Sequence, residues 1–183
     1  MLRLRLSRWV LSGALAACGA LALSACGDRA AEGKDCPAAM RAHSASGFCI
    51  PRYVSLKRGE VDGRKGPGMD YPALWVYRVR GLPVQVVAET TDWRRICDPD
   101  GGAVWVHRSM IDGRRTVMAL GAAPIALRRE PSADAPIAGL LNARALAGLD
   151  RCDNGWCKLK AGGVSGWASA AQLWGVADAA QCR

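Results

Sequence analysis

The sequence predicts an all-β protein in which two small β-barrels follow a cleaved signal peptide and a short tether. Its composition includes 21 glycines and seven tryptophans but a single phenylalanine, which favours short strands joined by many turns. A stretch with two tryptophans flanking a turn occurs at residues 92–110 and again, shortened, at residues 155–173. Two copies of one strand pattern indicate two barrels rather than one larger domain.

Residues 1–25 are expected to be a signal peptide. Three arginines lie within the first eight residues, and the uncharged run that follows is about 15 residues long, short of the roughly 20 that a spanning helix needs. The run ends in Leu-Ser-Ala-Cys-Gly, which resembles the lipobox of bacterial lipoproteins. That resemblance implies that Cys26 is lipidated and becomes the mature N-terminus; the alternative is an ordinary secretory signal with an incidental cysteine. Because Gly27 follows Cys26, the resemblance also implies sorting to the outer membrane.

The charge of the mature chain limits its partners. Removing the signal removes three arginines and no acid, so the net charge falls from +9 to +6. A positive surface suits anionic envelope polymers or acidic lipid head groups. We therefore expect a lipid-anchored protein on the periplasmic face of the cell envelope, with the outer membrane favoured and with no nucleic acid as partner.

Six cysteines remain after the signal and the lipidated position. An even number in an exported chain predicts disulfides, and the absence of Cys-x-x-Cys spacing argues against zinc, so no metal or cofactor is expected. Asn154-Gly155 predicts a two-residue hairpin turn. This turn places Cys152 opposite Cys157 with Cα atoms about 4.5–5.5 Å apart, a distance that suits a disulfide. Three pairings of the other four cysteines stay open, and the preferred bonds are Cys36–Cys49 and Cys97–Cys182.

The remaining segments divide as follows. Residues 26–49 are expected to be a tether, residues 50–118 the first module, residues 122–177 the second, and residues 178–183 a tail. Within the first module, strands are expected at residues 52–56, 73–79 and 84–88, followed by the hairpin. Residues 61–71 are expected to form a long loop without regular structure, because glycine and proline interrupt it.

The two modules align as an internal repeat. The spacing Pro67-x-x-Asp70-x-Pro72 recurs as Pro131-x-x-Asp134-x-Pro136. From the first proline of each motif to the first tryptophan, Trp93 or Trp156, the distances are 26 and 25 positions. Between the two tryptophans of each module, ending at Trp105 and Trp167, they are 12 and 11. The chain is therefore predicted to be a tandem repeat.

The segments VDGRKGPGMDYP, GLPVQVVAETTDWRRI and AVWVHRSMI together resemble the bacterial SH3-like domain. The second module matches more loosely through LRREPSADAP, GWCKL and SGWASAAQLW. The resemblance covers about 125 residues and implies a small barrel that binds extended peptides beside its long first loop. In the second copy Glu130-Pro131-Ser132 replaces the usual Gly-Pro-Gly, so a different loop shape is expected there.

Catalysis is not expected. A Cys–His hydrolase needs a nucleophile beside a base, but the cysteines are assigned to disulfides and the only histidines are His43 and His107. Two barrels and a tether fill the 158 residues that follow the signal. We therefore expect a non-enzymatic protein.

Strand alternation predicts which side chains of the hairpin are exposed. If Ile96 points into the barrel, Val104 and Val106 join it, and Trp93 and Trp105 point the opposite way. The two tryptophans would then form a half-exposed aromatic ledge, with Arg94, Arg95 and Arg108 adding positive charge nearby. The alternative is that both rings simply pack against the barrel's own loops.

A comparison of the copies extends the predicted ligand site. Tyr71, Trp75 and Tyr77 correspond to Ala135, Gly139 and Leu141 in the second module. Aromatic side chains present in one copy alone suggest a surface used only there. The predicted ligand-binding residues are therefore Tyr71, Trp75, Tyr77, Trp93 and Trp105. The alternative is that Trp75 and Tyr77 pack against the other barrel or the tether.

Taken together, the sequence predicts an envelope lipoprotein whose tandem barrels bind a peptide, either the peptidoglycan stem peptide or a segment of an envelope protein. The alternative is a structural subunit of an envelope assembly that has no peptide-binding groove.

Overall fold

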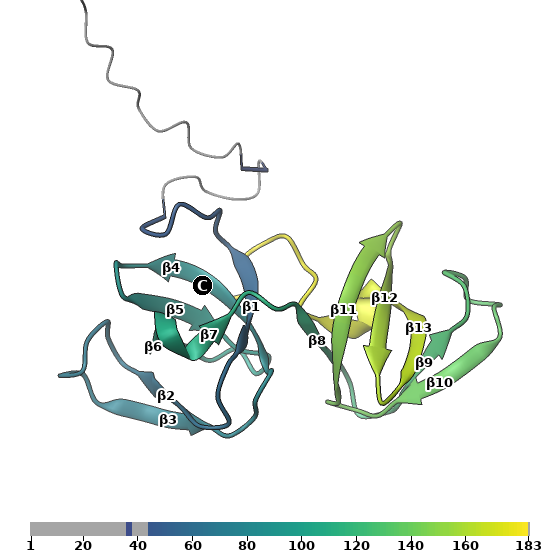
Figure 1. Cartoon of the computed structure of the whole chain (residues 1–183), viewed down its shortest axis with the longest axis horizontal. Coiled ribbons are helices and arrows are strands. Elements are labelled where there is room, and N and C mark those ends of the chain that lie inside the picture. The colour runs from purple at the N-terminus through teal and green to yellow at the C-terminus, as the bar shows by residue number, and fades with distance from the viewer. Residues whose placement is uncertain (1–35, 38–43, 183) are drawn as a thin grey trace, which may run out of the picture. The chain divides into compact units, whose positions relative to one another are not determined.

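The computed structural model of the chain describes residues 36–37 and 44–182, all of which fall within one compact unit. The predicted signal peptide, Cys26 and most of the tether lie outside these residues. The described part consists of strands and turns arranged in two seven-stranded sheets (Figure 1). It contains no helix with the length and apolar character needed to cross a bilayer.

The first sheet forms the first barrel, and a single 3-10 turn, η1 (Arg108–Met110), separates its last two strands. Its strands are β1 (Arg52–Leu56), β2 (Val61–Arg64), β3 (Ala73–Tyr77), β4 (Pro83–Glu89), β5 (Trp93–Cys97), β6 (Ala103–His107) and β7 (Ile111–Asp112).

The second sheet repeats this arrangement, with η2 (Ala170–Gln172) before its last strand. Its strands are β8 (Thr116–Ala119), β9 (Ile125–Arg128), β10 (Ile137–Leu141), β11 (Leu146–Asp153), β12 (Trp156–Ala161), β13 (Val164–Ser169) and β14 (Leu173–Trp174). The strand orders are β3-β2-β6-β5-β4-β1-β7 and β10-β9-β13-β12-β11-β8-β14. The same order in both sheets confirms the tandem repeat that the sequence predicts.

Two details differ from the sequence expectations. Residues 61–64 form a strand, β2, rather than the start of an irregular loop, because Gly63 permits a close approach: a Cβ there would lie 2.8 Å from the Val104 side chain. The first sheet ends at Asp112, whereas Thr116–Ala119 pairs with β11 and β14 in the second sheet. Residues 116–118, which were expected in the first module, therefore belong to a strand of the second sheet.

The core of the first barrel follows the predicted alternation. Ile96, Val104 and Val106 are fully buried together with Val84 and Val86 from β4. In the second barrel, Leu127 and Leu159 lie in the corresponding core. Apolar side chains on one face of each strand thus close each small barrel.

Three disulfides brace the described residues, in the pairs Cys36–Cys49, Cys97–Cys182 and Cys152–Cys157. These are the three pairings preferred from the sequence. Asn154 and Gly155 have φ angles of 46° and 79°, as the predicted hairpin turn requires. Cys152 pairs directly with Cys157 across β11 and β12, with Cα atoms 4.0 Å apart.

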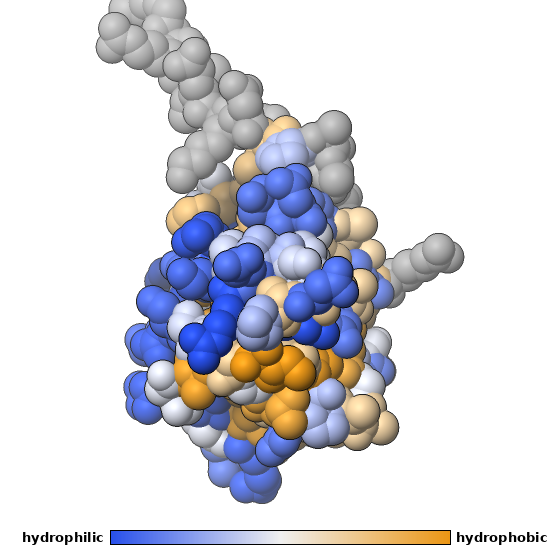
Figure 2. Space-filling view, turned by 90° about the vertical axis from the view of Figure 1, so that its right-hand side faces the viewer, coloured by the Kyte–Doolittle hydropathy of each residue, from blue (hydrophilic) through white to orange (hydrophobic). Residues whose placement is uncertain are grey.

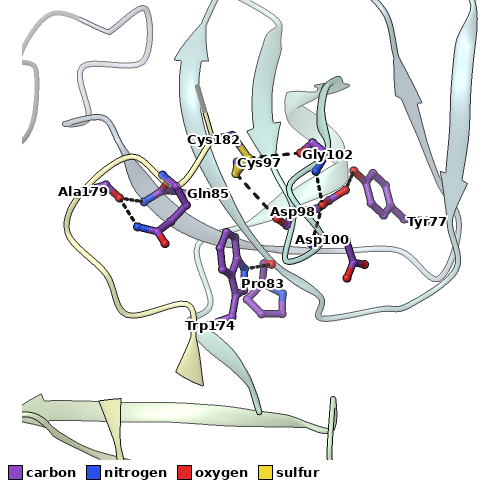
Figure 3. The surroundings of a disulfide bond; sticks show 11 residues. Tyr77, Pro83, Gln85, Cys97, Asp98, Asp100, Gly102, Trp174, Ala179 and Cys182 are labelled. Atoms are coloured by element: carbon purple, nitrogen blue, oxygen red, sulfur yellow. Dashed lines mark hydrogen bonds between the residues drawn. A yellow bond between two sulfur atoms is a disulfide. The ribbon is translucent and has the colours of Figure 1, made fainter. Parts of the chain in front are cut away.

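The second barrel and the C-terminal segment contact the first barrel directly (Figure 3). Trp174 donates its indole N–H to the Pro83 carbonyl at 2.9 Å, and its ring packs edge-on against Tyr53. Further along, Gln85 binds the Ala179 carbonyl at 2.8 Å, beside the Cys97–Cys182 bond. The described part of the predicted tail, residues 178–182, is therefore held against β4 and β5.

Candidate functional site

The hairpin of β5 and β6 presents its two tryptophans on the outer face of the first barrel. Trp93 pairs with His107 and Trp105 with Arg95, while Ile96 and Val104 point inward. Both indoles are half-buried. The Trp93 ring meets the His107 ring at 5.4 Å in an edge-to-face arrangement, so these two rings form one rigid surface.

A groove of about 300 Å³ lies beside Trp93. One wall comes from β2 and the loop that follows it, and the other from the hairpin and η1. The side chains that give it its chemical character are Asp62, Arg64, Met69, Trp93, His107 and Met110. The groove therefore combines an aromatic floor and two flexible thioethers with a carboxylate and a guanidinium at its edge.

Arg64 holds the loop that forms one wall of the groove. Its Nη1 donates to the carbonyls of Met69 at 3.1 Å and Tyr71 at 2.7 Å. The side chain of Met69 projects beyond this brace and is 70% exposed. A methionine held by a fixed backbone but free in its side chain suits an apolar ligand of variable shape.

His107 has a defined orientation at the boundary of the groove. Its Nδ1 accepts the backbone N–H of Ser109 at 3.3 Å and lies 2.8 Å from the Ser109 hydroxyl. Because Nδ1 is the acceptor, the neutral ring carries its proton on Nε2. His107 therefore offers a hydrogen-bond donor at the groove.

The five predicted ligand residues do not form one surface. Trp93 and Trp105 share the outer face as predicted. Tyr71 is on the loop, where its ring covers Gly66: a Cβ on that glycine would lie 2.4 Å from the ring. Trp75 and Tyr77 do not line the groove. They lie on the face of β3 that is directed toward the core.

Tyr77 belongs to the core of the first barrel (Figure 3). Its side chain is only 9% exposed, and its hydroxyl donates to Asp98 Oδ2 at 2.8 Å. Burial, together with the nearby charge of Asp98, raises the pKa of Tyr77. Its counterpart Leu141 is also buried, so the two copies fill one core position with different side chains. The prediction of Tyr77 as an exposed ligand residue is wrong.

Trp75 closes the same end of the barrel. Its ring packs edge-on against Tyr77 at 6.2 Å, and a Cβ on Gly102 would lie 2.8 Å from it. The indole remains 39% exposed, but it covers the β5–β6 turn instead of facing the groove.

Arg94 also differs from its predicted role. It shares the inward face of β5 with Ile96, and its side chain is 7% exposed where it meets Glu89. Its Nη1 donates to the Thr90 carbonyl at 2.8 Å. Arg94 therefore adds no charge to the outer face, which receives its charge from Arg95 and Arg108.

The loop after the second strand keeps its form in both copies. Lys65 N–H donates to the Pro72 carbonyl and Gly68 N–H to that of Gly66. The equivalent bonds join Arg129 to Pro136 and Ser132 to Glu130. The expectation of a different loop shape in the second copy is wrong, because these bonds are made by the backbone and do not require Gly-Pro-Gly.

The groove's side chains do differ between the copies. Strand pairing aligns β2, β6 and η1 with β9, β13 and η2. In that alignment Met69, His107 and Met110 are replaced by Ala133, Ser169 and Gln172. Asp62 is likewise replaced by Ala126. Sequence reasoning missed these residues because it compared aromatic residues alone, although the same repeat alignment contains the signal.

A second apolar surface lies on the side of the second barrel that carries β9 and β10 (Figure 2). The exposed large apolar residues of β10 and β13 are Ile137, Leu140 and Val164. Gly139 allows this cluster to be compact, since a Cβ there would meet Val164 at 3.1 Å. Among the described residues no group of histidine, cysteine or acidic side chains could hold a metal ion.

Comparison with known proteins gives two matches to one family model, described as the bacterial SH3 domain, at residues 57–113 and 121–175. Together these matches cover more than half of the sequence. No curated protein matches the chain.

Two solved structures from Trichomonas vaginalis are similar to this chain. NlpC2 is 13% identical with a TM-score of 0.32, over 68% of this chain and 48% of its own. NlpC1 is 12% identical with a TM-score of 0.32, over 76% of this chain and 50% of its own. The matched region therefore spans about half the length of these structures, and neither contributes to a functional assignment.

Proposed function

Because this chain belongs to the bacterial SH3 domain family, we propose that it is a non-enzymatic cell-envelope protein whose first barrel binds an extended peptide. The observation that carries this proposal is the groove beside Trp93. Its Met69, His107 and Met110 stand on a framework that the second barrel reproduces without them. Both copies build the same backbone framework, so groove side chains that occur in the first copy alone favour a ligand of the first barrel.

The ligand in this proposal is the peptidoglycan stem peptide or an exposed segment of an envelope protein. An extended backbone can place side chains on the Trp93 floor and against Met69, while the Nε2–H of His107 donates to a peptide carbonyl. Trp105 continues the outer face beyond Trp93, and Tyr71 stabilises the loop at the rim. No cofactor takes part.

The proposal also includes attachment to the membrane through a lipid on Cys26, with the barrels on the periplasmic side and the outer membrane as the favoured location. Three disulfides are typical of an extracytoplasmic protein. The tether and anchor would hold the first barrel close to the cell wall.

Cosedimentation of the purified protein with isolated sacculi tests the binding. The matched pair of variants is Met69→Ala and Leu140→Ala, which shorten side chains 70% and 65% exposed in different barrels. Neither position is part of a core, so both variants should fold. We expect wild type and Leu140→Ala to sediment with sacculi and Met69→Ala to be retained several-fold less.

A structural subunit of an envelope assembly is the second candidate function. The observation that favours it is the apolar cluster of Ile137, Leu140 and Val164 on the second barrel, since such patches mark protein interfaces. In that case Leu140→Ala would release the protein from a stoichiometric membrane complex, and Met69→Ala would have no effect. The same pair of variants therefore separates the two functions.

A further inference from the structure

A charged cluster closes one end of the first barrel. Arg52 from β1 and Arg94 from β5 both form ion pairs with Oε1 of Glu89 on β4. The Glu89 side chain is 0% exposed, and its Oε2 accepts the backbone N–H of Ser46 at 3.0 Å. These groups sit where the apolar core ends.

The cluster carries an uncompensated positive charge. Two guanidinium groups face one carboxylate, and Arg94 is 7% exposed. Nη1 of Arg52 is buried and has no hydrogen-bond acceptor among the described residues. Excess buried positive charge destabilises a fold unless another group neutralises it, so an anion beside the cluster would stabilise it.

A cavity of about 660 Å³ adjoins this cluster. It is separate from the groove but shares His107 with it. The lining residues that decide its chemistry are Phe48, Arg52, Arg94, His107, Arg108 and Ile111. Phe48 lies over the Arg52 guanidinium, with 5.1 Å between Cζ and the ring centre. The cavity therefore places cationic groups beside apolar walls.

The second barrel closes the same place in a different way. Glu89 and Arg94 are the second residue pair after the bulge between β4 and β5. The second residue pair after the corresponding bulge between β11 and β12 is Cys152 and Cys157, which form a disulfide. This fold can therefore be closed at this position by a disulfide. The charged cluster and the cavity of the first barrel are not needed for stability alone.

We infer that the cavity at the Arg52–Glu89–Arg94 cluster binds a carboxylate group of the peptide ligand. One carboxylate would balance the surplus charge, and arginine is suited to bind it with two parallel hydrogen bonds. The walls formed by Phe48 and Ile111 would hold the aliphatic part next to the carboxylate. This inference deepens the proposed function, because the cavity and the groove share His107 as a lining residue and one extended peptide could reach both.

Titration of the full chain with N-acetyl-alanyl-alanine and with its C-terminal amide tests this assignment. The readout is the backbone N–H resonances of Phe48, Ser109 and Gly113, followed by nuclear magnetic resonance. We expect saturable shifts with the acid and, because a hydrogen bond to a charged group is at stake, about tenfold or more weaker binding of the amide. Equal binding of acid and amide, or no saturable shift with either, would overturn the inference.

Inorganic phosphate is the second probe, because a lipid or polymer phosphate carries the same type of charge. If phosphate saturates the same resonances and the acid does not, the site is a phosphate site and the carboxylate assignment is wrong. If the acid binds and phosphate competes only weakly, the assignment stands.

Arg108→Gln and Arg151→Gln provide the matched variants. Both remove an arginine that is well exposed, 61% and 58%, and paired with an aspartate, but only Arg108 lines the cavity. Arg108→Gln should weaken binding of the acid several-fold and Arg151→Gln should not. Equal weakening by both would show a general charge effect and contradict a specific site.

The variant Met69→Ala distinguishes a failure of this inference from a failure of the proposed function. Met69→Ala should lose sacculus binding and keep its affinity for the small acid. If sacculi depend on Met69 but the acid does not bind, only the carboxylate site fails. If the acid binds and sacculi do not, the peptide-binding function fails instead.

Discussion

At the scale of single residues, Arg64 and Arg128 hold equivalent positions and make the same bond. Arg64 Nη1 donates to the Tyr71 carbonyl at 2.7 Å, and Arg128 Nη1 donates to the Ala135 carbonyl at 2.6 Å. The arginine is thus part of the scaffold in both copies. What changes is the side chain that the braced loop presents, Met69 in one copy and Ala133 in the other.

Tyr77→Phe tests whether Tyr77 is a core residue. The variant removes the hydroxyl that donates to buried Asp98, and we expect a loss of about 1.5–3 kcal/mol in the free energy of unfolding, the usual range for hydrogen bonds to charged groups. Urea denaturation measures the loss. Sacculus binding should not change. A variant of normal stability that no longer binds sacculi would place Tyr77 at the ligand site after all.

Glu89→Gln tests the charged cluster. The change leaves Arg52 and Arg94 without a counter-charge, which typically costs about 3–5 kcal/mol for a buried pair. Chemical denaturation at neutral pH should detect it. A loss below 1 kcal/mol, about the value of an exposed ion pair, would contradict the assignment of a buried cluster.

The same variant should alter the dependence of stability on pH. Burial raises the pKa of Glu89, but the hydrogen bonds from Ser46 and the charge of Arg52 outweigh it and hold the pKa below its ordinary value of 4.5. Because the folded-state pKa is the lower one, the ionised carboxylate stabilises the fold above pH 4.5, and this stability is lost as the pH falls through the folded-state pKa. Glu89→Gln should lack this acid-dependent loss.

Residue-scale predictions from the sequence succeed where alternation along a strand decides the outcome. Ile96, Val104 and Val106 are buried as expected. Arg94 lies on the same inward face as Ile96, but its charge led to an exposed assignment. Its partner Glu89 and the neighbouring Arg52 come from other strands, and strand periodicity contains no information about such pairs.

At the scale of elements, the β11–β12 hairpin is specified by local sequence. Asn154-Gly155 sets the turn, the turn sets the register, and the register brings Cys152 opposite Cys157. The two strands and their disulfide could be predicted because every determinant lies within six residues. Strand β2 was missed because its glycine is required by packing against Val104, a contact distant in the sequence.

Replacing both Cys152 and Cys157 by alanine tests this hairpin. Closing so short a loop restricts the unfolded chain by about 2 kcal/mol, so the melting temperature should fall by roughly 4–8 °C. Differential scanning calorimetry measures the shift. Sacculus binding through the first barrel should persist, and a variant that binds less but melts normally would contradict the role of this disulfide as a staple.

At the scale of the whole molecule, the described residues form two barrels that are joined by more than a linker. Trp174 binds the Pro83 carbonyl from 91 positions away along the chain, and the Cys97–Cys182 disulfide closes a span of 85 residues. Repeat spacing predicted the number of barrels. The Cys97–Cys182 bond was among the pairings preferred from the sequence. The contact of Trp174 with Pro83 could not be predicted, because the residues involved differ between the copies and have no sequence pattern in common.

These contacts predict one cooperative thermal transition for both barrels. Trp174→Ala combined with alanine at Cys97 and Cys182 should separate it into two transitions in calorimetry, because each barrel retains its own core. Two independent transitions in the wild type would show that the contacts do not couple the barrels.

We propose that the first barrel binds a peptide through the groove beside Trp93. Nuclear magnetic resonance of the ¹⁵N-labelled chain titrated with soluble peptidoglycan fragments, or with a peptide from a captured envelope protein, tests it most directly. We expect saturable shifts at Met69, the Trp93 indole, His107 and Met110, with no comparable change at Ala133, Trp156, Ser169 and Gln172. Shifts of equal size at both sets of positions, or shifts confined to Ile137, Leu140 and Val164, would contradict it.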